Sequence, residues 1–206
     1  MFIVPTGIDF SFYKEKSHSN VPKDFQSKMF LLYAVRLSRP KRIADMFATF
    51  EVALTINTDL QFIMVGDGPL FNKLISLVNR KHLNENVHFL GQLPKPELRG
   101  WMQSCEAGIL LSHNKSSPIS VKEYLACGKP VVANNVGDIA DYIIDDHTGF
   151  IVNPDNPEQV AKAILACVDN SFAFHDNCVR MAEKYDERVI NEKLFQLIRQ
   201  FDHATT

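Results

Sequence analysis

The sequence predicts an α/β fold in which helices cover both faces of a doubly wound, parallel sheet of about six strands. Two observations predict this class. Short apolar runs that end in Gly, Ser, Asn or Arg recur along the chain, and helix-length segments with an apolar residue about every 3.6 positions lie between them. Alternation of this kind is typical of parallel strands joined by crossover helices.

The elements follow one another in a regular order. The expected strands cover residues 29–35, 60–65, 87–90, 107–111, 130–133 and 149–152. The expected intervening helices cover residues 41–55, 69–81, 95–104, 118–127 and a shorter 138–144. Asn156-Pro157-Glu158 predicts the capped start of a helix that runs to Val168. Amphipathic patterns then predict two appended helices, over 171–184 and 187–201.

Length and composition limit the class of protein. A chain of 206 residues, 46% of them hydrophobic, can bury a normal core in one domain. With Lys plus Arg at 22 and Asp plus Glu at 24, the net charge of −2 gives no global attraction for nucleic acid or anionic membranes. The four cysteines lack a CxxC pair, so we expect neither a disulfide scaffold nor a metal cluster, and a reducing cytoplasm fits best.

Residues 117–133 place one carboxylate, Glu123, inside a helix that leads into a buried strand. Ser117-Pro118 predicts the helix start, and Gly128-Lys129-Pro130 predicts its end. The amino end of such a helix lies at the carboxyl edge of the sheet, where open α/β folds bind ligands and where the helix dipole favours phosphate. Glu123 is therefore placed to reach a sugar or ribose hydroxyl beside a bound phosphate.

The segment Glu123-Tyr-Leu-Ala-Cys-Gly-Lys-Pro-Val-Val-Ala133 resembles the glutamate-alanine-glycine-proline-valine-valine segment of the retaining family 4 glycosyltransferases, also called group 1. Further segments match this family in the same order, namely Pro5–Asp9, Val35–Lys41, Met64–Pro69, Asn86–Gly91, Asn135–Gly137 and His147–Val152. The resemblance implies the carboxyl-terminal, donor-binding half of the two-domain GT-B fold, which is a Rossmann-like domain.

The resemblance also implies a function and a domain plan. We expect transfer of a hexose, with retention, from a nucleoside diphosphate sugar to a glycan or lipid-linked acceptor, as in polysaccharide biosynthesis. Residues 1–27 would form the connector and linker from an amino-terminal domain, and residues 28–206 the donor-binding domain. The segment 17–27 is polar and carries Pro22, so we expect it outside the core. The amino-terminal half is expected to complete the active site and to mediate any peripheral membrane contact, so this chain alone is expected to be inactive.

Arg36 and Lys41 bracket the turn after the first strand and form a candidate anion site. Their spacing alone fits a solvated basic turn equally well. The family uses the matching residues on the donor diphosphate, and the resemblance therefore favours catalytic and donor-binding roles for Arg36, Lys41 and Glu123. The family usually has glycine where this chain has Val35 and Arg42.

The resemblance assigns further donor contacts. Gln92 and Leu93 match positions whose backbone faces the base, with more weight on Leu93, and Ser117, Pro118 and Ser120 match positions at the diphosphate. The donor is expected to carry UDP or GDP, and no metal ion is expected because two cations take the place of Mg²⁺. Lys115 stands where the family carries a glutamate near the transferred sugar. It either helps to neutralise phosphate or is an ordinary exposed lysine.

Two other functions stay open. The first is a binding or subunit module that keeps the fold and has lost the chemistry through Lys115. The second is a sugar-nucleotide epimerase with the same fold, which would be expected to carry a carboxylate at that position. A nicotinamide or flavin enzyme is disfavoured because no G-x-G-x-x-G occurs, and Gly66-Asp67-Gly68 is best explained as a strand-to-helix turn.

Overall fold

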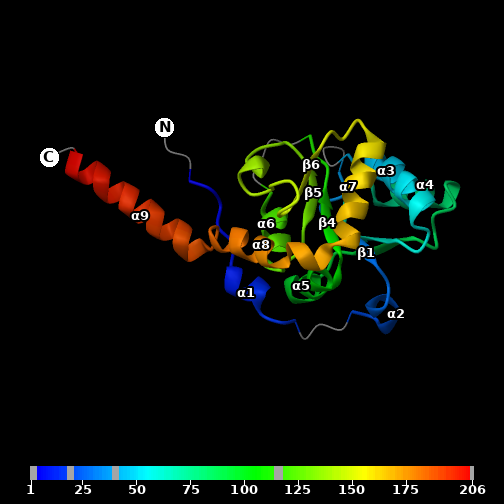
Figure 1. Cartoon of the computed structure of the whole chain (residues 1–206), viewed down its shortest axis with the longest axis horizontal. Coiled ribbons are helices and arrows are strands. Elements are labelled where there is room, and N and C mark those ends of the chain that lie inside the picture. The colour runs from blue at the N-terminus through cyan, green and yellow to red at the C-terminus, as the bar shows by residue number, and fades with distance from the viewer. Residues whose placement is uncertain (1–3, 18–20, 39–41, 114–117, 205–206) are drawn as a thin grey trace.

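A computed structural model describes residues 4–17, 21–38, 42–113 and 118–204. These residues form a six-stranded parallel sheet in the order β3-β2-β1-β4-β5-β6 with helices on both faces (Figure 1). The strands are β1 (Phe30–Ala34), β2 (Gln61–Val65), β3 (Val87–Gly91), β4 (Ala107–Leu110), β5 (Val131–Asn134) and β6 (Gly149–Val152). The predicted fold class and all six predicted strands are confirmed.

The central strands are buried on both faces, which explains their nearly unbroken apolar sequences. Leu32 of β1 pairs with Ile63 of β2, and Leu31 pairs with Ala107 of β4 on the other side. After β1 the chain builds β2 and β3 outward, then returns to place β4 against the free edge of β1. The strand order therefore reverses between β1 and β4. Ligands of open α/β sheets bind at the carboxyl ends of the strands at such a point.

The helices lie in two layers. On one face α3 packs against α7, and on the other α6 packs against α8 and α1 (Figure 1). The helices are α1 (Phe10–Lys14), α2 (Lys23–Gln26), α3 (Ile43–Ile56), α4 (Phe71–Arg80), α5 (Lys95–Ser104), α6 (Ile119–Ala126), α7 (Pro157–Asp169), α8 (Ser171–Glu183) and α9 (Glu187–Ala204). Most predicted helices are confirmed to within about three residues. The helix expected over 138–144 is only a short 3₁₀-helix, Ile139–Asp141.

The segment before β1 packs more closely than the sequence predicts. It contains two short helices, α1 and α2, and the Asp9 side chain caps α1 by accepting a hydrogen bond from the Phe12 N–H at 3.0 Å. Val21 is buried, and the Phe25 ring packs edge-on against Trp101. The expectation that residues 17–27 lie outside the core is therefore wrong for these two side chains. Their burial removes apolar surface from water, which the polar composition of the segment obscures.

The start of the chain runs beside the start of α9. Ile8 donates to the Tyr185 carbonyl and accepts from the Glu187 N–H, each at 2.9 Å. A Cβ on Gly7 would come within 2.7 Å of the Glu187 Cα, so the close approach requires glycine. These contacts join the first described residues to the carboxyl-terminal helix.

The helix α9 extends away from the rest of the molecule (Figure 1). Apolar side chains along it remain exposed, namely Val189, Leu194, Phe195 and Ile198, and Phe195 is 64% exposed. Among the residues that the structure describes, these four side chains lack the contacts that bury the apolar stripe of an ordinary amphipathic helix. No helix in the described part of the chain is long and apolar enough to cross a membrane.

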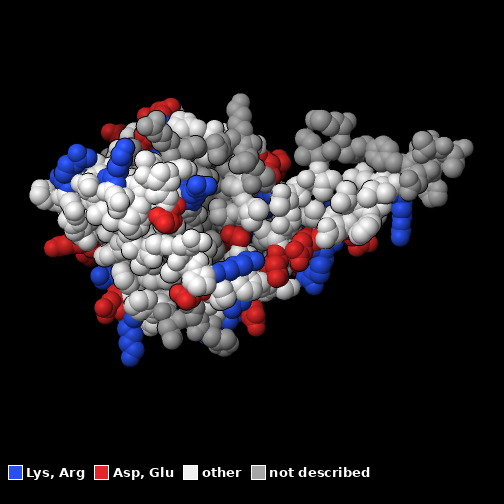
Figure 2. Space-filling view, turned by 180° about the vertical axis from the view of Figure 1, so that it is seen from behind, with Lys and Arg blue, Asp and Glu red and all other residues white. Residues whose placement is uncertain are grey.

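Charged side chains are distributed without a dominant sign. Figure 2 shows lysine and arginine interspersed with aspartate and glutamate over the visible face. This agrees with the net charge of −2 and leaves local geometry to decide any phosphate binding.

Gly66 and Gly91 offer a matched test of the packing at the end of β2. Both have positive φ, +133° and +67°. A Cβ at Gly66 would lie 1.9 Å from the Val35 carbonyl oxygen, whereas a Cβ at Gly91 meets nothing within 4 Å. We expect Gly66→Ala to lower the free energy of unfolding by about 3 kcal/mol or more, and Gly91→Ala by about 1–2 kcal/mol. Urea denaturation measures both, and equal losses would contradict this account of Gly66.

Candidate functional site

A cavity of about 550 Å³ lies at the carboxyl edge of the sheet, beside the point where the strand order reverses. We call it the switch-point cavity. Its lining combines residues that follow β1, β2 and β3 with residues of α5 and α6. Among the predicted site residues, it is lined by Arg36, Leu93, Ser120 and Glu123, together with Gln92. The lining as a whole brings together four separate parts of the sequence, within 34–36, 65–68, 92–98 and 120–123.

A larger cavity, of about 760 Å³, contains none of the predicted site residues. It lies where α5 and α6 end, with Ser104 and Ala126 in its lining. Helix carboxyl ends carry partial negative charge, and the lysines in this lining, such as Lys129, compensate that charge. The switch-point cavity therefore remains the stronger candidate, because it matches the edge at which open α/β folds bind ligands.

Glu123 projects from α6 and is half-buried. Its Oε1 accepts a hydrogen bond from the hydroxyl of Tyr13 on α1. Burial raises the pKa of Glu123, while the Tyr13 hydrogen bond and the charge of Lys95 act in the opposite direction. Burial and the neighbouring Glu123 raise the pKa of Tyr13, so the phenol keeps its proton and acts as the donor.

Arg36 is exposed on the turn that follows β1. Backbone hydrogen bonds fix this turn on both sides, because Val35 donates to the Val65 carbonyl and Leu37 donates to the Asp67 carbonyl, each at 3.0 Å. Asp67 in turn accepts from the Gly68 N–H at 2.6 Å. The side chain of Asp67 is thus engaged in the turn, as the sequence predicts, although it also lines the cavity. Arg36 is held on a rigid base, and its guanidinium makes no hydrogen bond or ion pair with the residues that the structure describes, so it can meet an anion.

The amino end of α6 faces the same region. The helix begins at Ile119 with Pro118 as its N-cap residue, and no side chain in the described part of the chain makes a capping hydrogen bond to it. Ser120 lines the cavity, while Pro118 is half-buried and does not. The amino end of a helix presents backbone N–H groups and the positive end of the helix dipole, which suit a phosphate.

Three predicted positions lie outside the described residues. Lys41, Ser117 and Lys115 fall in the segments 39–41 and 114–117. Their places in the site stay predictions.

A family model described as glycosyl transferases group 1 matches residues 14–188. The chain belongs to this family. It is 25% identical over 190 residues to the N-acetyl-alpha-D-glucosaminyl L-malate synthase of Bacillus anthracis, covering 91% of this chain and 49% of that enzyme. It is 27% identical over 178 residues to a D-inositol 3-phosphate glycosyltransferase of an Arthrobacter species, covering 82% of this chain and 42% of that protein. The group 1 chain therefore spans about half or less of the length of these relatives.

Solved structures agree on the fold. Sucrose-phosphate synthase from Thermosynechococcus elongatus superimposes with a TM-score of 0.79 at 22% identity, covering 98% of this chain and 52% of that one. HepE from Anabaena in complex with UDP superimposes with a TM-score of 0.78 at 21% identity, covering 94% of this chain and 56% of that one. At this level of identity the similarity shows that this group 1 chain has the same fold.

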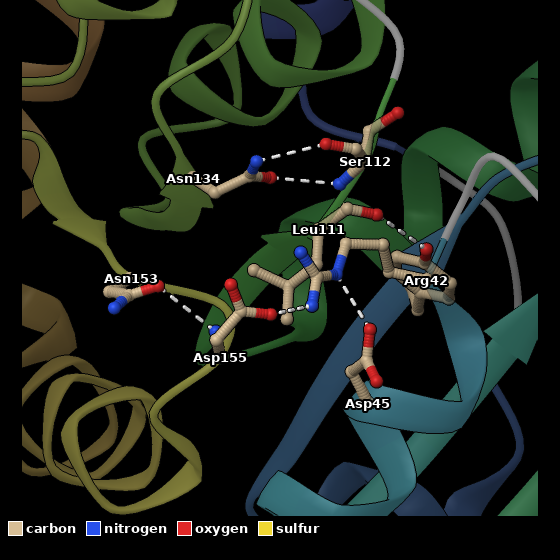
Figure 3. Close-up of polar contacts among 8 residues, drawn as sticks. Arg42, Asp45, Leu111, Ser112, Asn134, Asn153 and Asp155 are labelled. Atoms are coloured by element: carbon tan, nitrogen blue, oxygen red, sulfur yellow. Dashed lines mark hydrogen bonds and ion pairs between the residues drawn. The ribbon is translucent and has the colours of Figure 1, made fainter.

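Arg42 was not predicted as a structural residue of the site. It is the N-cap residue of α3 and has φ +47°, a left-handed conformation that favours glycine. Its guanidinium bridges Asp45, at 2.6 Å, and Asp155 in the segment between β6 and α7 (Figure 3). These two ion pairs oppose the backbone strain, which explains how this chain accommodates arginine where group 1 members usually carry glycine.

Asn134, at the end of β5, fixes the neighbouring end of β4. Its side-chain amide accepts from the Ser112 N–H at 2.8 Å and donates to the Ser112 carbonyl at 2.9 Å (Figure 3). The amide thereby continues the pairing of the two strands beyond their backbone ladder. Ser112 follows β4 at the carboxyl edge of the sheet, so Asn134 fixes the chain where it leaves this strand.

Replacement of Glu123 by glutamine tests the electrostatics of the site. The folded-state pKa of Glu123 is raised by burial, so its contribution to stability is present at low pH and lost as pH rises through that pKa. Glutamine stays neutral and keeps an oxygen that can accept from Tyr13. We expect Glu123→Gln to be as stable as the wild type at about pH 4, below the pKa of an unfolded glutamate, and more stable than the wild type at about pH 7.5.

Urea denaturation at the two pH values measures this difference. Glu97→Gln, at an exposed position on α5, serves as the control and should follow the wild type at both. A Glu123→Gln protein that is less stable than the wild type at the higher pH would contradict the assignment.

Proposed function

We propose that this chain is the donor-binding part of a retaining glycosyltransferase that moves a hexose from a nucleoside diphosphate sugar to a glycan or lipid-linked acceptor. The observation that carries the proposal is that Arg36 and Glu123, which are far apart in the sequence, line one cavity at the point where the strand order reverses. A cation and a carboxylate placed in this way suit the diphosphate and the ribose of one nucleotide.

The chemistry follows from these positions. Arg36, with Lys41, stabilises the negative charge that develops on the diphosphate as it leaves the sugar. Glu123 accepts hydrogen bonds from the ribose and orients the donor. Leu93, next to Gln92 at the end of β3, provides apolar contact for the base. In this proposal the two cations do the work that a metal ion does in other phosphate sites.

Similar proteins support a nucleotide donor. HepE has been solved with UDP-glucose, the pneumococcal O-GlcNAc transferase GtfA with UDP and GlcNAc, and TarM of Staphylococcus aureus with UDP. These ligands belong to those proteins and favour UDP as the first nucleotide to test here. The four cysteines are free and buried, which supports a reducing, cytoplasmic location.

A thermal-shift experiment tests the donor site. A nucleotide at about 100 times its dissociation constant adds about 2.7 kcal/mol, which for a chain of this size raises Tm by about 5–10 °C. We expect a rise with UDP, GDP or ADP that Arg36→Gln reduces by more than half. Arg80→Gln, an exposed arginine at the far end of α4, is the matched control and should leave the rise unchanged. If none of the three nucleotides raises Tm, the proposed donor site is wrong.

The exposed apolar face of α9 suggests that a second domain or subunit binds there. The same observation favours the alternative function, a binding module that has lost the chemistry. The chain spans about half or less of its relatives, and apolar side chains on α9 lack cover in the described structure. We propose that an amino-terminal domain covers this face and supplies the acceptor site, so that the chain alone transfers no sugar.

Self-association tests the proposed function of α9. Because apolar surface without cover associates in water, we expect the average mass in sedimentation experiments to rise with concentration. Phe195→Glu should lower the association at least about tenfold. Gln196→Glu adds the same charge at a neighbouring polar position and should have little effect. A chain that stays monomeric throughout, or equal effects of the two substitutions, would count against a docking role for this face.

A further inference from the structure

We infer that Tyr13 is a positioning residue of the donor site, which holds the Glu123 carboxylate in its binding orientation from the connector that precedes the sheet. The inference rests on the proposed function, because it concerns how the ribose carboxylate is held. It adds to the site a residue that lies 110 positions from Glu123 in the sequence.

Tyr13 is firmly placed. Its side chain is only 1% exposed, and its hydroxyl donates to Glu123 Oε1. Its backbone carbonyl accepts from Gln103 Nε2 of α5 at 2.8 Å and lies 3.6 Å from the thiol sulfur of Cys127. Contacts with α5 and with the end of α6 therefore fix the backbone of Tyr13, and the hydroxyl has little freedom to leave Glu123.

The two oxygens of the Glu123 carboxylate differ in their hydrogen bonds. Oε1 is occupied by Tyr13, whereas Oε2 receives no hydrogen bond from any residue in the described part of the chain. Glu123 lines the switch-point cavity, so the second oxygen is available to a ligand there. A glutamate that is free to rotate would lose side-chain entropy on binding a ribose. Tyr13 removes that cost in advance, because it holds one rotamer before the ligand arrives.

The groups around Glu123 determine how its pKa shifts, and therefore how nucleotide binding changes with pH. Tyr13 faces it from α1, Lys95 from α5 and Cys127 from its own helix, while Arg36 and Asp67 share the cavity. Burial raises the pKa of Glu123, and the Tyr13 hydrogen bond and Lys95 counteract that rise. A ribose hydroxyl donates to the ionised carboxylate, so nucleotide binding weakens as pH falls through this pKa. Loss of the Tyr13 hydroxyl moves that weakening to higher pH.

The role also links the donor site to the connector. The connector pairs with the chain before α9 through Ile8, and Tyr13 follows one helical turn after the cap of α1. A displacement of the connector would move the Tyr13 hydroxyl away from Glu123. Donor binding and connector position are coupled through this one hydrogen bond.

The test compares UDP binding by wild type and Tyr13→Phe with calorimetry between about pH 5 and about pH 9, using GDP or ADP if thermal shift favours one of them. Phenylalanine keeps the ring and removes only the hydroxyl. We expect binding at neutral pH to weaken about three- to tenfold, and the acid limit of binding to move to higher pH. Tyr185→Phe removes a hydroxyl that bonds the Asp141 carbonyl instead and should change neither.

A second measurement does not depend on the phenylalanine variant. Site-specific replacement of Tyr13 by 3-fluorotyrosine makes the phenol a stronger donor, and the acid limit should then move to lower pH. A purely structural role of Tyr13 would not produce shifts of opposite sign in the two variants.

The outcomes separate the two proposals. If wild type binds UDP and both Tyr13 variants reproduce its affinity and pH profile, the positioning role is overturned and the donor site stands. If wild type binds none of the nucleotides, the donor site is overturned and the positioning role falls with it. Opposite shifts of the acid limit in the two variants support the positioning role.

Discussion

The contact of Tyr124 with the sheet determines where the rest of the site lies. Its ring packs on Gly108 of β4, where an added Cβ would come within 2.6 Å of it. Its hydroxyl donates to the Leu32 carbonyl at 2.9 Å and accepts from the Ala34 N–H at 3.2 Å. These contacts hold α6 against the two strands between which the strand order reverses. Without glycine at 108 the helix would stand further from the sheet, and Glu123 with it.

Three consecutive residues of α6 hold three different parts of the molecule, because successive side chains of a helix point about 100° apart. Lys122 is fully buried, and its ammonium donates to the Thr6 carbonyl at 3.1 Å and lies 3.4 Å from Asp138. Glu123 faces the switch-point cavity and Tyr13, and Tyr124 faces the sheet. One helix therefore joins the segment before the sheet, the switch-point cavity and the core.

The sequence predicted the sheet and much of the cavity because each depends on local patterns. Apolar runs mark strands that are buried on both faces, and the parallel arrangement then places Arg36 near the helix that carries Glu123. The contacts of Tyr13 and Lys122 join segments more than 100 residues apart, and no local pattern encodes such pairs. A lysine is normally expected at the surface, so the burial of Lys122 had no signal in the sequence.

Lys122 and Glu123 are neighbouring charged residues of α6, and contacts within the fold account for the burial of Lys122 better than for that of Glu123. The Lys122 ammonium meets a carbonyl, a carboxylate and the rings of Tyr142 and Tyr185, so its burial is compensated within the fold. Glu123 has a pKa raised by burial and one oxygen that no described residue contacts through a hydrogen bond. An arrangement that disfavours the ionised carboxylate lowers stability at neutral pH. Such a group is better explained by a ligand that completes its hydrogen bonds than by a role in folding.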